Sequence, residues 1–261
     1  MLRIHSLYLY PVKSCAGIRV SHVWAGPQGL AGDRRWMVTD STGAMLTARK
    51  HPELLRVQPL PDESGLWLTA PGMPSLHVER PVSGPVVSSQ VWQDAVDKAC
   101  LSEAGSEWFG RYLGQDVKLV WIPPENLRPV DPAWAGDAWT GFADGFPLLV
   151  THQASLEDLA RRVGMALDMR RFRPNVVIGG GEAWAEDGWS TLRAGEVTIA
   201  LSKPCSRCVM TTLDPDTQAR HPEVLRTLAG FRKTEAGVIF GRNALVRAPG
   251  MLCAGMSLRE E

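Results

Sequence analysis

The stretch Lys203-Pro-Cys-Ser-Arg-Cys-Val-Met-Thr-Thr-Leu-Asp-Pro-Asp-Thr217 carries the most informative pattern in the chain. It holds two cysteines, Cys205 and Cys208, in a single Cys-x-x-Cys spacing. The residues after them, Val209–Thr212, are apolar or β-branched, which is typical of a strand. We therefore expect strand-and-turn structure around these thiols, and the rest of the chain is best interpreted outward from them.

Four interpretations of the two thiols stay open at this point. A structural zinc site would need a second cysteine pair or a nearby pair of histidines, and His221 stands alone. A thioredoxin-type redox pair would begin a helix, where the dipole lowers the thiol pKa. A single functional thiolate is favoured by the nearby cations Lys203 and Arg207, and soft thiolates suit metals that accept sulfur ligands. Two buried structural cysteines are the fourth possibility.

Two glycine-associated runs nearer the start are rich in cations and hydrogen-bond donors. In Tyr10-Pro-Val-Lys-Ser-Cys15 a lysine and a serine follow the first expected strand, where a lysine can hold an anionic group. A solvated lysine is the alternative. In Gly29-Leu-Ala-Gly-Asp-Arg-Arg35 paired arginines can bind phosphate through two parallel hydrogen bonds. A surface ion pair of Asp33 with one arginine is the alternative there.

A third cationic run, Arg170-Arg-Phe-Arg-Pro-Asn175, precedes a strand that looks fully buried. Three unpaired arginines beside a buried strand would be costly, which indicates an anion that neutralises them. Pro174 predicts an extended Arg173, and Asn175 adds a donor and an acceptor at the strand entrance. We expect an anion pocket here. With the thiolate run, these motifs would suit a phosphorylated ligand that carries a soft metal.

The composition predicts a packed globular protein. Of 261 residues, 44% are hydrophobic and 21% charged, which argues against disorder. Basic and acidic residues both number 28, and this balance argues against a nucleic-acid binder. No run reaches the roughly 18 apolar residues of a membrane span, and the N-terminus resembles a strand more than a signal peptide. Five cysteines, an odd count, disfavour a disulfide framework. We expect a cytoplasmic protein without nucleic-acid or membrane partners.

The expected architecture is α+β and mainly β, with two domains, residues 1–120 and 121–261. Short alternating runs broken by Gly, Pro and Asp predict a barrel or curled sheet in the first domain. A proline-rich composition shift after Trp121 marks the boundary. We expect helices at 103–114 and 155–165, the latter capped by Ser155, and one near Pro222. A strand is expected at 176–179.

Taken together, these runs resemble the MOSC family, named for the C-terminal domain of molybdenum-cofactor sulfurase. The resemblance is strongest to members with an N-terminal MOSC β-barrel domain, including the mitochondrial amidoxime-reducing components and their bacterial relatives. It rests on Tyr10–Cys15, Gly32–Trp36, Arg171–Asn175 and the cysteine run, with a looser match at Val238–Asn243. The motifs occur in the family's order over the whole chain. The resemblance implies an N-terminal MOSC β-barrel-like domain packed on a C-terminal MOSC β-barrel domain with a few helices.

The same resemblance implies a molybdenum cofactor, a pterin dithiolene, between the two domains. By the family pattern Cys208 is the ligand to molybdenum and the catalytic residue. Further positions match those that contact the pterin or its phosphate, namely Lys13, Ser14, Arg34, Arg173, Asn175 and Ser206. The role of Cys205 stays open.

The implied activity is two-electron reduction of small N-hydroxylated compounds such as amidoximes, hydroxylamines and N-hydroxylated bases. Some bacterial relatives carry an iron–sulfur domain after the MOSC domain, which is not seen here, so we expect electrons from a separate flavin, heme or iron–sulfur protein. A carrier that binds the molybdenum cofactor without turnover is the alternative function. A metal-free redox pair of Cys205 and Cys208 is a third, and it leaves the arginines unexplained.

Proton donors are harder to identify from the sequence. Asp214 and Asp216 follow the cysteines, but Asp-Pro-Asp is typical of a turn in which Asp caps its own backbone. We favour the turn. His152 stands alone beside an apolar run and is expected to be structural.

Overall fold

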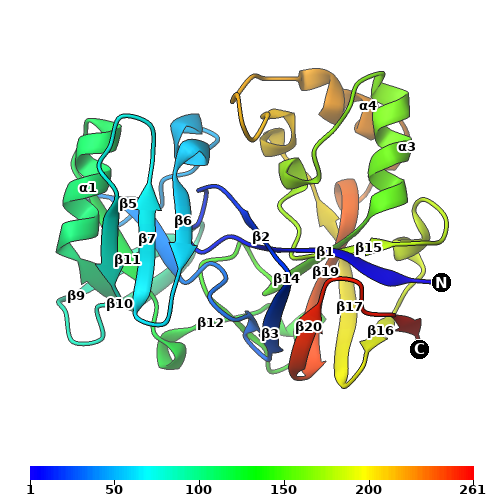
Figure 1. Cartoon of the computed structure of the whole chain (residues 1–261), viewed down its shortest axis with the longest axis horizontal. Helices are drawn as coiled ribbons and strands as arrows, with labels where there is room; N and C mark the ends of the chain where they lie inside the picture. The colour runs from blue at the N-terminus through cyan, green and yellow to red at the C-terminus, as the bar shows by residue number, and fades with distance from the viewer.

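The computed structural model describes residues 1–261, and Figure 1 shows two lobes side by side. The protein is mainly β. Its α-helices are α1 (Glu103–Leu113), α2 (Pro132–Ala135), α3 (Gln153–Val163) and α4 (Pro222–Arg232). Its short 3-10 helices are η1 (Pro52–Arg56), η2 (Pro124–Asn126), η3 (Met169–Phe172), η4 (Ala185–Asp187) and η5 (Val209–Thr212). None of these helices has the length and hydropathy that a bilayer crossing requires.

The larger lobe is built on a nine-stranded sheet in the order β2-β1-β15-β14-β19-β17-β16-β21, with β18 paired to β19. Its strands are β1 (Arg3–Leu9), β2 (Ile18–Val20), β14 (Leu148–His152), β15 (Val176–Gly179), β16 (Thr191–Ala194), β17 (Val197–Ser206), β18 (Lys233–Thr234), β19 (Gly237–Ala248) and β21 (Arg259–Glu260). All neighbours are antiparallel except β14 and β15, which α3 connects as a parallel pair. The first strand of the chain thus lies inside a sheet made mostly of later residues.

The smaller lobe holds two sheets and α1. The four-stranded sheet has the order β5-β11-β10-β9 and the three-stranded sheet has the order β6-β7-β8. Their strands are β5 (Trp36–Asp40), β6 (Gln58–Pro61), β7 (Gly65–Thr69), β8 (Leu76–Glu79), β9 (Val86–Val91), β10 (Asp94–Ser102) and β11 (Val117–Trp121). Two small sheets complete the fold, β20-β3-β4 and β12-β13. These comprise β3 (His22–Gly26), β4 (Gly29–Leu30), β12 (Arg128–Pro129), β13 (Trp139–Thr140) and β20 (Gly250–Cys253).

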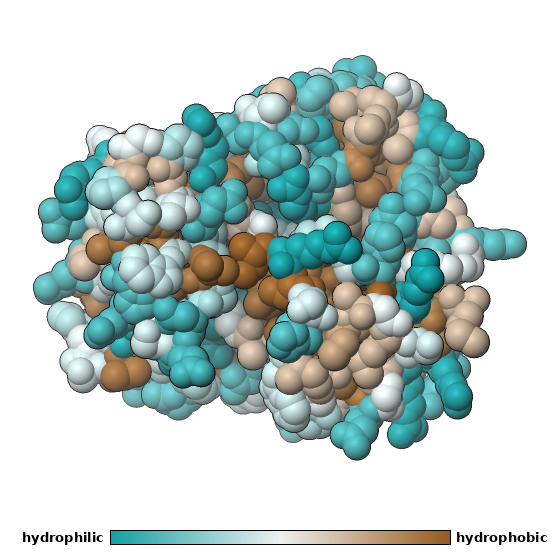
Figure 2. Space-filling model, viewed as in Figure 1, coloured by the Kyte–Doolittle hydropathy of each residue, from teal (hydrophilic) through white to brown (hydrophobic).

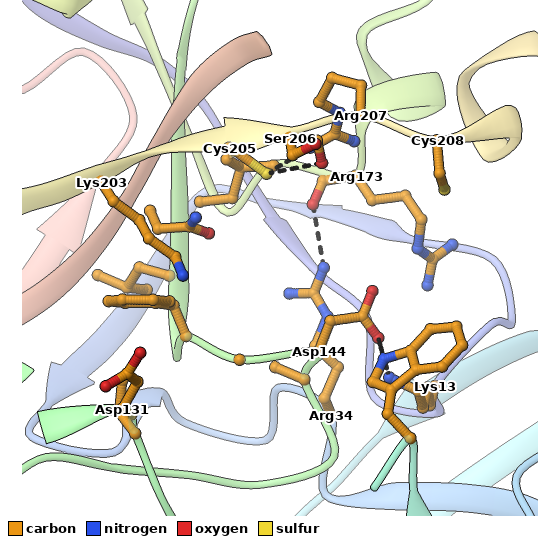
Figure 3. Close-up of a pocket in the computed structure, with 18 of the residues that line it drawn as sticks. Lys13, Arg34, Asp131, Asp144, Arg173, Lys203, Cys205, Ser206, Arg207 and Cys208 are labelled. Atoms are coloured by element: carbon orange, nitrogen blue, oxygen red, sulfur yellow. Dashed lines mark hydrogen bonds and ion pairs between the residues drawn. The ribbon is translucent and has the colours of Figure 1, made fainter. Parts of the chain in front are cut away.

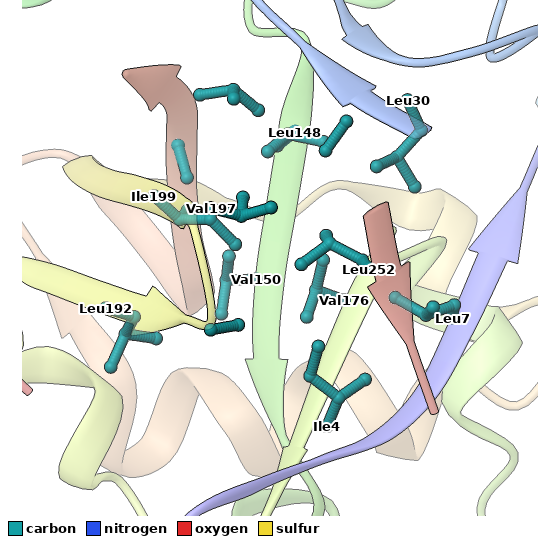
Figure 4. Close-up of a cluster of buried hydrophobic side chains, with 14 of the residues drawn as sticks. Ile4, Leu7, Leu30, Leu148, Val150, Val176, Leu192, Val197, Ile199 and Leu252 are labelled. Atoms are coloured by element: carbon teal, nitrogen blue, oxygen red, sulfur yellow. The ribbon is translucent and has the colours of Figure 1, made fainter. Parts of the chain in front are cut away.

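Each lobe has its own hydrophobic core. Figure 4 shows the core of the larger lobe, where side chains from both ends of the chain, such as Ile4 and Leu252, lie in one cluster. The second core lies under α1 and includes Trp108. It also takes in Val12, Cys15 and Leu213, which belong to the sequence motifs. Because hydrophobic burial dominates the stability of a fold, these anchors fix the motif-bearing loops against the smaller lobe. The face in Figure 2 is largely hydrophilic, with apolar residues gathered near its centre.

The mainly β fold, the helix at 103–114 and the buried strand at 176–179 are confirmed. None of the strand orders closes on itself, so the predicted barrels are open sheets. The helix expected from Ser155 begins earlier, at Gln153, because His152 caps it by accepting from the Ala154 N–H. Ser155 lies in the first turn and donates to Glu186.

The strand predicted at Val209–Thr212 is wrong. β17 ends at Ser206, and these residues form η5. The hydroxyl of Thr211 donates to the Cys208 carbonyl at 3.0 Å, and that of Thr212 donates to the Val209 carbonyl at 2.7 Å. Local bonds of this kind let a β-branched threonine satisfy a helical turn. The strand propensity of the run is thereby overridden.

Candidate cofactor and active site

A cavity of about 910 Å³ is lined by residues of both lobes. Figure 3 shows the side chains of its wall. Every residue that the sequence assigned to cofactor or metal lines this one cavity, namely Lys13, Ser14, Arg34, Arg173, Asn175, Ser206 and Cys208. The fold therefore brings the separate motifs together at one place.

Cations outnumber carboxylates on the cavity wall. Its seven basic residues are Lys13, Arg34, Arg49, Arg128, Arg173, Lys203 and Arg207, and its three acidic residues are Asp94, Asp131 and Asp144. The whole chain is balanced in charge, so this excess is local. A cleft lined mainly by one sign of charge concentrates ions of the other sign. The cavity therefore suits an anionic ligand.

The Lys13 ammonium group is buried and paired with an acid on the cavity wall. Its Nζ donates to the Phe142 carbonyl at 2.8 Å and to a carboxylate oxygen of Asp144. Burial lowers the pKa of Lys13, and the Asp144 charge opposes this effect. Burial alone would raise the pKa of Asp144, but the Lys13 ammonium holds it well below its usual range. Asp144 is therefore an ionised acceptor at neutral pH.

The ring of Tyr10 holds two guanidinium groups. The Cζ atoms of Arg34 and Arg173 lie 4.5 and 4.2 Å from the centre of this ring. The tyrosine is fully buried, and burial raises its pKa well above the usual range. The ring stays neutral, and its negative faces attract both cations. This attraction offsets the repulsion between two arginines that lie close together.

Arg34 is held from three directions. Its Nη1 donates to Oδ2 of Asp33 at 2.6 Å and to Oδ1 of Asn175 at 3.0 Å, and its Nη2 donates to the Arg173 carbonyl at 3.0 Å. The ion pair with Asp33, one of the two possibilities raised by the sequence, is present, and Arg34 still lines the cavity. Arg34 is therefore a fixed cation, aimed before any ligand arrives.

Asn175 supports Arg34 from behind the cavity wall. Its Oδ1 also accepts from the Leu149 N–H at 3.1 Å, and its Nδ2 donates to the Tyr8 carbonyl at 3.3 Å. The residue is 1% exposed. Because its amide is already committed to the protein, Asn175 positions Arg34 more readily than it contacts a ligand.

Arg173 is the one arginine of its run that faces the cavity. Its backbone is left-handed, with φ 54°, so the extended conformation predicted from Pro174 is wrong. A residue before proline avoids the right-handed helical region, and Arg173 reaches the left-handed one as the end of η3. Its Nη1 donates to the Cys15 carbonyl at 2.8 Å, and no carboxylate pairs with it. Burial lowers its pKa to about 10, so it remains charged at neutral pH.

The sequence predicted that Arg170 and Arg171 also contribute to the anion pocket, and this prediction is wrong. Arg170 pairs with Asp168 and Asp216, and Arg171 pairs with Asp214. Carboxylates nearby in the fold thus neutralise two of the three arginines. The anion pocket of this run is reduced to Arg173.

The two cysteines of the motif differ in their surroundings, and neither forms a disulfide. Cys208 is exposed, and its Sγ makes no hydrogen bond within the protein. Cys205 is partly buried, and its Sγ accepts from Nη1 of Arg207 at 2.8 Å. Nη2 of Arg207 donates to the Phe172 carbonyl at 2.7 Å, which fixes the guanidinium. Of the pair, Cys208 is the thiol open to a ligand.

Both serines of the predicted site present hydroxyls at turns. Ser14 has a left-handed backbone, with φ 69°, directly after Lys13. Ser206 ends β17 and lies against Gly237, where an added Cβ would come 2.5 Å from the serine Oγ. Gly237 also has a positive φ of 104°, so a side chain is disfavoured there twice over. The tight approach keeps Ser206 in place.

The acids considered as proton donors lie elsewhere. Oδ1 of Asp214 accepts from the Thr217 N–H at 2.9 Å, which confirms the turn that the sequence favoured. The ring of His152 contacts the Gly180 carbonyl through Nε2 at 2.6 Å and caps α3 through Nδ1. His152 is therefore structural, as expected, and no histidine lines the cavity.

Comparison with known proteins identifies the family of this chain. Residues 1–116 match the MOSC N-terminal beta barrel domain and residues 137–259 match the MOSC domain. The human mitochondrial amidoxime-reducing component 1 is 32% identical to this chain, over 97% of this chain and 81% of its own length. The chain belongs to the MOSC family. The human amidoxime reducing component 2 is 32% identical, over 88% and 72% of the two chains.

Among solved structures, the YUAD protein from Bacillus subtilis aligns over 99% of this chain and 94% of its own, with 10% identity and a TM-score of 0.46. Neither MOSC model covers residues 117–136, the stretch in which the predicted boundary after residue 120 falls. That boundary stays a prediction. The strands β1 to β4 belong to the first MOSC region by sequence, yet β1 and β2 pair within the sheet of the second.

Several residues of the MOSC cavity carried no sequence signal. Asp144 follows a glycine-rich loop, and nothing nearby distinguishes it from a surface acid. Arg49, Trp92 and Arg128 likewise lie outside any recognisable motif, and they reach the cavity only through hairpins and the segment between the two MOSC regions. Trp134 belongs to that segment as well. Lys203 was noted only as a neighbour of the cysteines.

Proposed function

We propose that this chain is a molybdenum-cofactor-dependent reductase of small N-hydroxylated compounds, with Cys208 as the protein ligand to the metal. One observation carries the proposal, namely an exposed and unengaged thiol that shares a cavity wall with seven cations. The similarity to proteins named amidoxime-reducing components supports a reductase that acts on a hydroxylated nitrogen.

The donor set on the wall fits a pterin phosphate that brings its own metal. No cluster of three or more His, Cys, Asp or Glu side chains is placed to hold a metal ion. A metal at Cys208 would therefore take its other ligands from a cofactor, and dithiolene sulfurs are soft ligands like the thiolate. Arg173, charged and without a carboxylate partner, is left for an anionic group such as a phosphate.

Each residue assigned to the cofactor would have a distinct part in holding it. Cys208 would supply the thiolate, and Ser14 and Ser206 would offer hydroxyls. The phosphate and pterin would be held by Lys13, Arg34 and Arg173, with Asn175 acting through Arg34. When bound, the cofactor supplies the two-electron redox chemistry, while the protein supplies position and charge.

The proposed reaction converts an N–OH group and two protons and two electrons into N–H and water. The electrons would come from a separate flavin, heme or iron–sulfur protein. The Lys13 ammonium holds Asp144 ionised, and no histidine lines the cavity. Because neither Asp144 nor a histidine is available as the proton donor, the protons would enter from solvent, which reaches the exposed Cys208.

The test is a comparison of Cys208→Ser with the matched control Cys253→Ser, purified from a host that makes the cofactor. Cys253 is partly buried and lies outside the cavity. We expect molybdenum and pterin in the wild type and the control, and turnover of an N-hydroxylated base with a reduced viologen dye. Cys208→Ser should lose the metal and the turnover. Absence of molybdenum from the wild type contradicts the proposal, and bound cofactor without turnover favours the carrier.

A further inference from the structure

One end of the cavity combines a cation with two aromatic rings. Nζ of Lys203 lies 5.6 Å from the ring centre of Trp134 and 5.4 Å from that of Phe146. No carboxylate pairs with this ammonium group, in contrast to Lys13. The rings attract the cation through their negative faces and hold it in the cavity without neutralising it. Lys203 is therefore free to donate to a ligand.

Trp134 is held as a fixed platform although half of it is exposed. It sits on α2, a short turn that Asp131 caps by accepting from the Ala133 N–H at 3.0 Å. Oγ of Ser202 donates to the Trp134 carbonyl at 2.8 Å, and Arg247 donates to the next carbonyl, that of Ala135, at 3.1 Å. These bonds tie the turn to β17 and β19. The indole is 50% exposed and lines the cavity.

Polar groups border this platform. Only Oδ1 of Asp131 is used in capping α2, which leaves the second carboxylate oxygen unengaged. Asn243 lines the same cavity, and Nδ2 is its one engaged side-chain atom, donating to the Pro204 carbonyl. In Figure 3, Lys203 and Asp131 lie on one side of the cavity, and Cys208 and Lys13 lie on the other. This end thus lies opposite Cys208 and Lys13.

We propose that Trp134 and Lys203 form a subsite for the planar aromatic part of the substrate. The subsite would take a nitrogen heterocycle, which stacks on the exposed indole and accepts a hydrogen bond from the Lys203 ammonium through a ring nitrogen or carbonyl. Asp131 would accept from a ring N–H on the same ring edge. A flat ring with both donors and acceptors matches this set, whereas an aliphatic hydroxylamine would use none of it. The inference rests on the proposed reductase and names the substrates that it favours.

Both residues are positioning residues. Stacking holds the ring and leaves the hydroxylated nitrogen to reach toward the Cys208 end of the cavity. Uniform binding of this kind acts on the KM and leaves the chemical step unchanged. A structural role for Trp134 would instead reduce activity on every substrate alike.

The experiment compares Trp134→Ala with the control Trp139→Ala in the holoenzyme. Trp139 has a similar exposure of 49% but does not line the cavity. The substrates are N6-hydroxyadenine and hydroxylamine, with a reduced viologen dye as the electron source, and adenine is the non-reacting probe for calorimetric binding. We expect Trp134→Ala to raise the KM for N6-hydroxyadenine and the Kd for adenine by about tenfold, with kcat and all hydroxylamine kinetics unchanged. Trp134→Phe should restore most of the binding.

Lys203→Met provides a second arm, since it removes the ammonium and keeps the aliphatic stem. It should weaken adenine binding, and Lys203→Arg should weaken it less. If Trp134→Ala matches Trp139→Ala, or if both substrates lose activity equally, the subsite is refuted while the reductase stands. If neither substrate is reduced but adenine binding depends on Trp134, the subsite stands and the reductase fails.

Discussion

Arg207 donates from Nη1 to the Sγ of Cys205 at 2.8 Å, and this contact separates the two cysteines of the motif. Two cysteines in a Cys-x-x-Cys spacing are usually expected to share one role. Here one thiol is engaged by a guanidinium that is itself fixed to the Phe172 carbonyl, and the other, Cys208, is exposed and unengaged. The geometry therefore favours two roles over a redox pair.

The five thiols should react with an alkylating reagent in a definite order. In protein without cofactor we expect Cys208 to react first, because it is the exposed one. Cys15 should stay protected until the protein unfolds, since it is fully buried and burial raises its pKa to about 12. Peptide mass spectrometry after brief labelling measures this order. Equal labelling of Cys205 and Cys208 would contradict the distinction drawn between them.

Asn175→Ala should destabilise the fold and loosen the anion site together. The change removes the acceptor of both Arg34 and the buried Leu149 N–H. An unsatisfied buried donor costs about 1–3 kcal/mol, so we expect a loss of that size in the free energy of unfolding by denaturant. Cofactor retention should fall as well. The control is Asn126→Ala, which removes only an exposed bond to the Lys98 carbonyl and should change stability little.

Much of the site could be predicted from the sequence because its motifs are contiguous. The runs around Lys13, Arg34 and Cys208 each carry several polar residues within a few positions, and the fold places these three residues on one cavity. Their side chains are chemically complementary, and residue types alone indicate this without any distances. The resemblance to the MOSC family then implied that these residues contact one cofactor between the two domains.

The remaining differences arise where tertiary contacts override local patterns. Three arginines in one run predicted a single anion pocket, but distant aspartates neutralise Arg170 and Arg171. The apolar run after Cys208 predicted a strand, but threonine hydroxyls close a 3-10 turn. Trp134 reaches the cavity from the four-residue helix α2 and Asp144 from a loop, and both segments are too short or irregular to show a periodic pattern that could have placed them.

Arg173→Gln should weaken anion binding much more than Arg170→Gln does. Arg173 faces the cavity without a carboxylate partner, whereas Arg170 is held between Asp168 and Asp216 outside it. We expect Arg173→Gln to lower the pterin and molybdenum content of the purified protein at least severalfold. Arg170→Gln should retain the cofactor and lose roughly 1 kcal/mol or less of stability, as partly exposed ion pairs contribute little. Equal cofactor content in the two variants would remove Arg173 from the site.

Glu186 should make the stability of the larger lobe depend on pH. Its carboxyl is fully buried on η4, its Oε2 accepts from the Ser155 hydroxyl at 2.8 Å, and its Oε1 has no partner. Burial raises its pKa from 4.5 to about 7. The folded state thus binds a proton that the unfolded state releases between pH 4.5 and 7. The free energy of unfolding should fall by about 3 kcal/mol over that window and change no further above it.

Glu186→Gln tests this linkage, because the amide keeps the shape of the neutral carboxyl and cannot ionise. Near pH 5 the variant and the wild type should unfold at similar denaturant concentrations. At pH 8 the variant should be the more stable by up to about 3 kcal/mol, since only the wild type then buries a charge. The matched control is Glu182→Gln, an exposed acid four residues earlier, whose unfolding should follow the wild type at both pH values. An advantage of Glu186→Gln that is the same at pH 5 and pH 8 would show that packing, and not ionisation, sets the difference.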